Sequence, residues 1–308
     1  MNLPITIQLS DSFFRAEKRS DYNVSENVKE IWAIQLDLLN KFINVCNKHN
    51  LHWYVGFGTL LGVIRHNGYI PWDNDVDVVM PRDDYDKLLD LGEKEFQHPY
   101  FFQNPKTENG RFFFSFSRLS NSRTTGASPE HWSSRMNCGI YMDIYPLDYL
   151  PDNSLALKKY LHKLHNIQYL SRFSGTFYRS KKIGITAKLK MFIHYVHFRL
   201  LGSPNPEQLF MLFNKYARKY NKQTKRVGCI IMGYKPNWTW DSVDWDEYEE
   251  HDFEMLKVRV PKGYHNILTQ TYGDYLQIPD DKTTHEYILF DAQTPYNEYF
   301  PQHGYAYK

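Results

Sequence analysis

"GFGTLLGVIRHNGYIPWDNDVDVVM", residues 56–80, joins a glycine-rich turn to three aspartates at alternate positions. We expect residues 73–80 to form a strand, in which Asp75 and Asp77 share one face while the valines between them face the core. Two carboxylates this close repel each other unless a cation lies between them. The stretch therefore predicts a strand with a cation-binding edge, directly after a turn and a short helix that ends at Asn67-Gly68.

The composition indicates a large folded protein. The chain has 308 residues, of which 42% are hydrophobic and 17% aromatic, enough for one large core or a core with a substantial insert. We expect a cytoplasmic protein, since residues 1–21 lack a signal-peptide pattern and no apolar run approaches the roughly 18 residues of a membrane span. Cys46, Cys138 and Cys229 show no C-x-x-C spacing, which favours free thiols over a disulfide framework or a zinc site.

Periodicity predicts an alternation of helices and strands. Apolar residues at three- and four-residue steps predict a helix over 24–50, and strand-like content follows at 51–55. Further expected elements are helices at 82–96, 154–201 and 207–225, and strands at 112–119, 139–147, 227–234 and 253–261. We expect an irregular acidic connection at 235–252, a short helix at 262–273 and an extended tail at 274–287.

These elements place residues suited to phosphate and metal chemistry close together. Gly56 and Gly58 let the backbone approach a phosphate, and the Thr59–Leu61 amides lie at a helix start, although a Gly-x-Gly alone also marks ordinary turns. Asp75 and Asp77 offer the oxygen ligands that Mg²⁺ prefers. Asp143 is the candidate third carboxylate, because an acid among apolar neighbours is costly to bury unless it is paired; a strand-edge aspartate facing water is the alternative.

The residues resemble a known family. "WYVGFGTLLGVIRHNGYIPWDNDVDVVMPRDDYDKLL" (53–89) resembles the signature of the LicD-type phosphocholine transferases, which include relatives of fukutin and its related protein. The sequence departs from that pattern mainly at Phe57 and at Asn74, where the family usually has Asp. "GIYMDIYPLD" (139–148) is similar to the second motif of the family, and "YGDYLQIPDDKTTHEY" (272–287) to its C-terminal one.

The resemblance implies an α/β (α+β) fold: a nucleotidyltransferase-like mixed sheet with flanking helices. The basic helical stretch between the matched motifs has no counterpart in the resemblance, and we expect it to be an insert. The expected division is a catalytic core at 1–150, the insert at 151–225 and a C-terminal part of the catalytic unit at 226–308. The implied reaction moves a phospho-alcohol, usually phosphocholine, from a CDP-alcohol to a sugar hydroxyl of a surface glycan or its lipid-linked precursor. Mg²⁺, or Mn²⁺, is the implied cofactor.

Carried over position by position, the resemblance makes Asp75, Asp77 and Asp143 the metal-binding and catalytic residues. It makes Gly58-Thr59 the phosphate-binding turn, with Asp73 a nearby acid. Asn74 lies on the opposite strand face, so we expect its departure from the family pattern to leave activity intact.

Several further side chains are candidates for substrate binding. They are Arg65 and His66 after the turn, Arg118 as a phosphate clamp, Lys282 and His285 in the C-terminal motif, and Trp72 as part of an aromatic cage for choline. A helix-end cap is an equal alternative for His66, a solvated strand end for Arg118 and core packing for Trp72. Trp132 is a second candidate for the cage.

The charge distribution predicts a partner. Residues 153–206 hold ten of the 37 Lys and Arg residues and none of the 35 Asp and Glu residues, so the rest of the chain is net acidic. In 154–201 the basic residues are mixed with Phe, Tyr and Leu, as in interfacial helices, which favours an anionic membrane surface at the inner face of the membrane. We expect no nucleic-acid partner, because no motif of that kind accompanies the charge.

Two other functions remain open. The same fold could transfer a nucleoside monophosphate to a small molecule, and product masses would separate the two reactions. A non-catalytic glycan-binding protein is the third reading, although a binding module has no need of three converging carboxylates.

Overall fold

The structure is a computed structural model. It describes residues 3–128, 131–132, 135–174, 204–230, 238–280, 282 and 288–305, with single residues between 185 and 200. Within these residues, no helix has both the length and the apolar character needed to cross a membrane.

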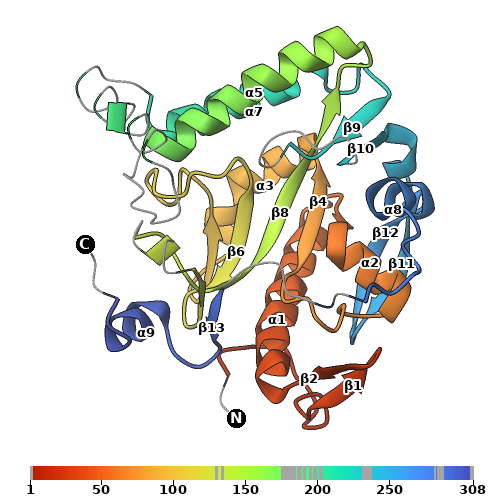
Figure 1. Cartoon of the computed structure of the whole chain (residues 1–308), viewed down its shortest axis with the longest axis vertical. Coiled ribbons are helices and arrows are strands. Elements are labelled where there is room, and N and C mark those ends of the chain that lie inside the picture. The colour runs from red at the N-terminus through yellow and green to blue at the C-terminus, as the bar shows by residue number, and fades with distance from the viewer. Residues whose placement is uncertain are drawn as a thin grey trace.

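A seven-stranded mixed sheet forms the centre of the molecule (Figure 1). Its longest strand, β8, pairs with β4 in parallel and with β6 and β9 in antiparallel. β3, β5 and β10 extend the sheet through β4, β6 and β9 respectively. The strands are β3 (Tyr54–Val55), β4 (Asp77–Pro81), β5 (Tyr100–Gln103), β6 (Ser117–Asn121), β8 (Ile140–Leu150), β9 (Arg226–Gly228) and β10 (Thr239–Asp241).

Three two-stranded sheets lie outside this central sheet. They are β1–β2 (Glu17–Arg19, Tyr22–Val24), β7–β13 (Thr125–Ala127, Leu289–Asp291) and the β11–β12 hairpin (Tyr248–Phe253, Leu256–Pro261). The expectation of an irregular connection over 235–252 is wrong, because β10 and most of β11 fall in it. "YEEHDF" is largely exposed, so its polar residues hide the strand signal, and pairing with β12 holds it extended.

Helices flank the central sheet. They are α1 (Glu26–Lys48), α2 (Phe57–His66), α3 (Arg82–Glu95), α5 (Ser154–Ser174), α7 (Pro206–Ala217), α8 (Tyr264–Tyr272) and α9 (Tyr296–Gln302), with 3₁₀ turns at Arg218–Tyr220 and Ser242–Trp245. The Ser25 side chain caps α1 by accepting a hydrogen bond from the Val28 amide. α2 ends at Asn67, which adopts the left-handed conformation as its sequence predicts. The α/β fold class is confirmed.

Two apolar clusters hold the fold together. The larger one draws on residues from Leu3 to Phe300, so the C-terminal segments pack on the same core as α1 and the sheet. The smaller one lies between α5 and α7 and includes Leu157, Leu164 and Phe213. The boundaries proposed at 150 and 225 stay a prediction. The predicted helix over 154–201 is observed for Ser154–Ser174, and most of its remainder lies outside the described residues.

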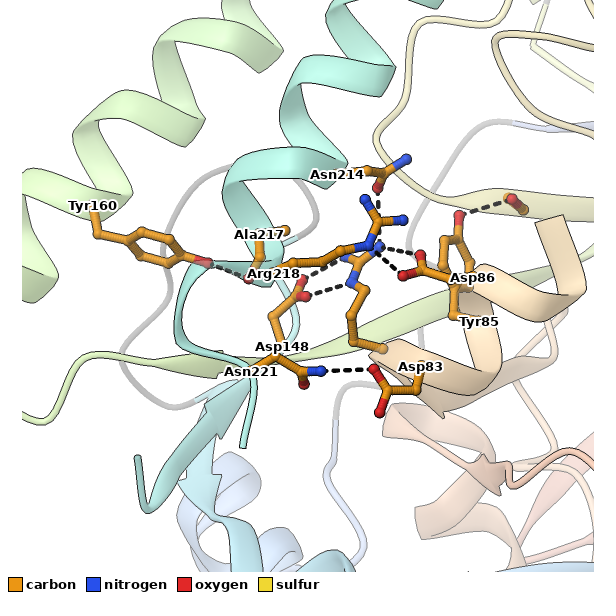
Figure 2. A network of polar contacts seen from close by, with 11 residues as sticks. Asp83, Tyr85, Asp86, Asp148, Tyr160, Asn214, Ala217, Arg218 and Asn221 are labelled. Atoms are coloured by element: carbon orange, nitrogen blue, oxygen red, sulfur yellow. Dashed lines mark hydrogen bonds and ion pairs between the residues drawn. The ribbon is translucent and has the colours of Figure 1, made fainter. Parts of the chain in front are cut away.

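A buried polar network joins this helical pair to the central sheet (Figure 2). Arg82 at the start of α3 donates two hydrogen bonds to the carboxylate of Asp148 on β8, at 2.6 and 2.8 Å, and a third to the Asn214 side chain on α7, at 2.9 Å. Asp86 of α3 pairs with Arg218, which follows α7. Polar side chains that have hydrogen-bond partners therefore fix α3, β8 and α7 to one another.

Candidate active site

Three neighbouring strands bring three charged side chains abreast. In the parallel β4–β8 pair, Asp77 lies directly opposite Asp143, and in the antiparallel β6–β8 pair Arg118 lies opposite the same Asp143. Directly paired residues project from the same face of a sheet, so all three side chains emerge together. All three are buried.

Asp75 reaches this cluster from outside the strand. We expected the strand to start near Asp73, but β4 begins at Asp77. The reason is an attachment to α1: the Asp73 carbonyl accepts a hydrogen bond from Trp32 Nε1, and the Asn74 carbonyl accepts one from Gln35 Nε2. The carbonyls that would pair within a sheet are thus used by a helix.

The carboxylates of the acidic cluster repel one another, and the pKa values of Asp75 and Asp77 are raised. Burial raises the pKa of Asp75 well above its ordinary value, and the negative charges of Asp73 and Asp77 raise it further. Burial and then the charges of Asp143 and Asp73 raise the pKa of Asp77 in the same way. Within the described part of the chain, Asp77 Oδ1 is buried without a hydrogen-bond partner. An added cation would relieve both the repulsion and this unsatisfied oxygen.

Asp143 differs from Asp75 and Asp77, because neighbouring side chains already balance its negative charge. Arg118 Nε donates a hydrogen bond to Asp143 Oδ1 at 2.6 Å, and the Tyr145 hydroxyl donates one to Oδ2 at 2.9 Å. The guanidinium of Arg118 also lies over the Tyr141 ring, 3.8 Å from its centroid. The predicted phosphate contact of Arg118 stays a prediction, and the structure adds a direct role in holding Asp143.

The glycine-rich turn supports the same cluster. A Cβ on Gly58 would lie 2.7 Å from Asp73 Oδ2, so only glycine allows the turn to approach this acid. Thr59 Oγ1 accepts a hydrogen bond from the Asp77 amide at 2.8 Å, which fixes the start of β4. Thr59 therefore positions Asp77, in addition to its predicted place in a phosphate-binding turn.

A pocket of about 390 Å³ opens beside the cluster. Its lining includes Gly58, Arg65, Trp72 and Asp73 from the first motif, Tyr272 at the end of α8 and Tyr275 just after it. Arg65 closes one wall by donating hydrogen bonds to the carbonyls of Tyr275 and Gln277, both at 3.1 Å. Aromatic rings and carboxylates thus face one space next to the acids.

Two basic side chains lie over the ring of Trp72. The Arg65 guanidinium is 5.9 Å and the Lys282 ammonium 5.6 Å from the centroid of its ring. Lys282 also donates a hydrogen bond to the Ser20 carbonyl. Lys282 therefore lies close to the pocket, as its motif suggests, while His285 lies outside the described residues.

His66 borders the pocket, whereas Trp132 does not. The centroid of the His66 ring lies 5.9 Å from that of Trp72, and a role for His66 in substrate binding stays a prediction. His66 accepts a hydrogen bond from Arg65 Nε, and burial followed by the charges of Arg65 and Arg19 lowers its pKa to about 4. It is therefore neutral near pH 7. Trp132 is buried and stacks on Phe300 with 4.8 Å between ring centroids, away from the residues that line the pocket.

Sequence reasoning did not foresee the contact of Tyr145 with Asp143, although the two share a strand face, and it missed Tyr272. Tyr272, at the end of α8, lines the pocket together with Asp73; burial and then the negative charges of Asp77, Asp73 and Asp75 raise its pKa. Tyr145 stands two residues after Asp143 on β8, and this spacing signals a shared face. Tyr272 opens the C-terminal motif, in which Lys282 and His285 attracted attention instead.

The residues present fit a divalent cation bound mainly by two carboxylates. Among the described residues, no group of three or more His, Cys, Asp or Glu side chains is arranged so that it could bind a metal ion. Arg118 and Tyr145 already engage the carboxylate of Asp143. Asp75 and Asp77 remain as hard oxygen donors that repel one another, and Asp77 has an unsatisfied oxygen.

The site combines a mixed sheet, an acid cluster and a glycine-rich turn. Residues 50–173 match the family model described as LicD/FKTN/FKRP, nucleotidyltransferase domain. The resemblance to this family that the motifs predicted is confirmed over these residues.

Individual relatives extend the match. The lipopolysaccharide cholinephosphotransferase LicD of Haemophilus influenzae is 27% identical over 273 residues, which cover 86% of this chain and 97% of that protein. Mannosyltransferase regulator 4 of Saccharomyces cerevisiae is 28% identical over 137 residues, 42% of this chain and 11% of the yeast protein. The family and the full-length bacterial relative support a transferase of the phosphotransferase type.

Proposed function

We propose that this chain transfers a phospho-alcohol, most simply phosphocholine, from a CDP-alcohol to a sugar hydroxyl of a cell-surface glycan or its lipid-linked precursor. The observation that carries the proposal is the strand register that sets Asp77 opposite Asp143, with Asp75 beside them. The similarity to the Haemophilus cholinephosphotransferase supports the choice of phosphocholine.

Bond changes in this reaction are simple. The acceptor oxygen forms a bond to the phosphorus that carries the alcohol, the bond from that phosphorus to CMP breaks, and the acceptor hydroxyl loses its proton. A divalent cation, Mg²⁺ or Mn²⁺, would be held by Asp75 and Asp77 and would supply positive charge against the diphosphate. Positioning by the protein then provides most of the remaining rate enhancement.

Each residue of the cluster has a physical role in this scheme. Asp143 orients the acceptor hydroxyl and receives its proton, while Arg118 and Tyr145 hold the carboxylate in place. The glycine-rich turn at Gly58 lets the diphosphate approach the backbone at the start of α2. The adjoining pocket, lined by Trp72, Tyr272 and Tyr275, has room for a part of the donor beyond the diphosphate.

Thermal unfolding with candidate donors tests the proposal. A ligand that binds only the folded state raises the melting temperature by mass action. CDP-choline, CDP-ethanolamine, CDP-glycerol and CTP would each be added with Mg²⁺ or Mn²⁺ to the wild type, to Asp75→Asn and to a matched control, Asp90→Asn. Asp90 is an exposed residue of α3, so its substitution removes the same charge at a distance from the acids.

The expected result is a shift with one CDP-alcohol that Asp75→Asn loses and Asp90→Asn keeps. Mass spectrometry of a reaction with a sugar acceptor would then show CMP and an acceptor heavier by the phospho-alcohol. An acceptor heavier by a nucleoside monophosphate, with release of pyrophosphate from CTP, would replace the proposal by nucleotidyl transfer. Binding of glycan without turnover of any donor would replace it by a glycan-binding function.

A further inference from the structure

α5 and α7 leave two faces uncovered by the rest of the described chain. Their inner faces pack together through Leu157, Leu161, Leu164, Leu209 and Phe213. Figure 1 shows the pair side by side along one edge of the molecule, beyond the end of β8. The outward faces therefore lie on a surface separate from the acid cluster.

The outward face of α5 mixes cations with apolar side chains. At 3.6 residues per turn its exposed residues fall within one half of the circumference. They are Ser154, Leu155, Lys158, Lys159, His162, Lys163, His165, Asn166, Tyr169, Leu170 and Arg172, and Leu155 is 61% exposed. Since residues 153–206 contain no Asp or Glu, nothing on this helix neutralises the cations.

α7 continues the same surface. Its exposed residues are Gln208, Met211, Leu212 and Lys215, with Lys219 exposed in the 3₁₀ turn that follows, and Met211 is 64% exposed. The ammonium of Lys163 on α5 lies 3.6 Å from the centroid of the Tyr216 ring on α7, so the two outward faces adjoin. Ile185, Leu189, Phe192, Ile193 and Leu200, described singly in the intervening segment, are also helical and exposed.

We propose that this α5–α7 surface docks onto an anionic lipid membrane. Lysines attract the acidic headgroups, at roughly a few-fold in affinity for each one near the surface, while the exposed Leu and Met side chains enter the boundary with the acyl chains. A nucleic-acid surface would account for the lysines and leave the solvent-exposed aliphatic side chains without a partner. The combination of both kinds of side chain favours lipid.

The Arg82–Asp148–Asn214 network gives this docking a consequence for the active site. Arg82 links α7 to β8, and the Tyr160 hydroxyl on α5 donates a hydrogen bond to the Ala217 carbonyl at the end of α7 (Figure 2). β8 also carries Asp143. A membrane bound at α5–α7 therefore holds the acid cluster in a fixed orientation relative to the bilayer, where a lipid-linked acceptor would be presented.

Vesicle flotation tests the inference with no donor or acceptor present, so its result is independent of the proposed transfer reaction. The wild-type chain would be mixed at low salt with vesicles of phosphatidylglycerol and phosphatidylcholine in equal parts, or of phosphatidylcholine alone. One variant carries Lys158→Glu, Lys159→Glu and Lys163→Glu. Its control carries Lys94→Glu, Lys106→Glu and Lys257→Glu, exposed lysines outside α5 and α7, and so has the same net charge.

We expect the wild type and the control to float with the anionic vesicles and not with phosphatidylcholine alone. The α5 variant should bind roughly a hundredfold more weakly. A second variant, Leu155→Ser with Met211→Ser, keeps every charge and should also bind more weakly than wild type. Circular dichroism of each variant establishes that it is folded.

Three outcomes would overturn the inference. One is equal binding to both kinds of vesicle, and another is an equal loss in the α5 variant and its control. The third is tighter binding of single-stranded or duplex oligonucleotides than of anionic vesicles at the same salt concentration, which would reassign the surface to nucleic acid.

Discussion

Two aspartates on one strand, Asp143 and Asp148, illustrate how differently this protein treats buried charge. They are five residues apart on β8, so they project from opposite faces. Asp148 receives two hydrogen bonds from Arg82, which Asn214 holds in turn. On the other face Asp143 has Arg118, but its neighbours Asp77 and Asp75 repel one another, and Asp77 has an unsatisfied oxygen.

The difference separates a structural charge from a functional one. A buried ion pair with every donor satisfied fixes the relative positions of three elements and offers nothing to a ligand. A buried cluster with excess negative charge costs stability, and a bound cation would offset that cost. The same strand therefore carries a structural ion pair at one end and a carboxylate of the proposed cation site at the other.

The largest effect is expected from Asp77→Asn. Loss of this carboxylate should lower the transfer rate by about a thousandfold, as for other groups that stabilise charge in a closed site. Because the substitution also removes a buried negative charge and its repulsion from Asp143 and Asp73, the metal-free protein should become more stable. Transfer assays and urea denaturation without divalent cations measure the two effects. A loss of both activity and stability would contradict the assignment.

A loss of stability is expected when the buried Arg82–Asp148 pair is broken. Arg82→Met leaves Asp148 buried without its partner, which should lower the free energy of unfolding by about 3–5 kcal/mol. Adding Asp148→Leu should recover much of that loss, since two apolar side chains replace the pair. Denaturant titrations of both variants measure this. If the single variant unfolds like wild type, the network does not hold α3, β8 and α7 together.

Matched tyrosine substitutions sharpen the comparison further. Tyr145→Phe removes the hydroxyl that holds Asp143, and should reduce kcat about tenfold while the KM for the donor stays near that of wild type. Tyr160→Phe removes the hydroxyl that links α5 to α7, and should lower the free energy of unfolding by about 1 kcal/mol with kcat unchanged. If both variants lost stability alone, Tyr145 would have no positioning role in the reaction.

The sequence was informative wherever a pattern is local. The amphipathic helix over 24–50, the turn and helix that end at Asn67, and the apolar run after Asp77 all follow from contacts within a few residues, and the structure has them. The start of β4 could not be predicted in this way, because Trp32 and Gln35 lie about forty residues from the carbonyls they bind.

The residues that lie next to the acids could not be predicted from local sequence patterns either. Arg118 meets Asp143 through a strand register that no local pattern fixes, and Tyr272 reaches the acids from the far end of the chain. The three aspartates themselves were found because isolated acids in apolar runs stand out. Their roles in binding a cation and a donor stay predictions for the experiments proposed here.

The last prediction concerns a third way in which the protein accommodates a titratable side chain, by keeping it neutral. His66 lies near Arg65 and Arg19, and its pKa falls from 6.5 to about 4. A group whose folded-state pKa is lowered takes up its proton more readily in the unfolded chain, so it reduces stability as the pH falls from 6.5 toward 4. His66→Gln keeps an acceptor for Arg65 and cannot titrate. Over this interval the wild type should lose about 1–2 kcal/mol more than the variant, measured by urea denaturation at each pH. Parallel stability curves would mean that folding does not lower the pKa of His66.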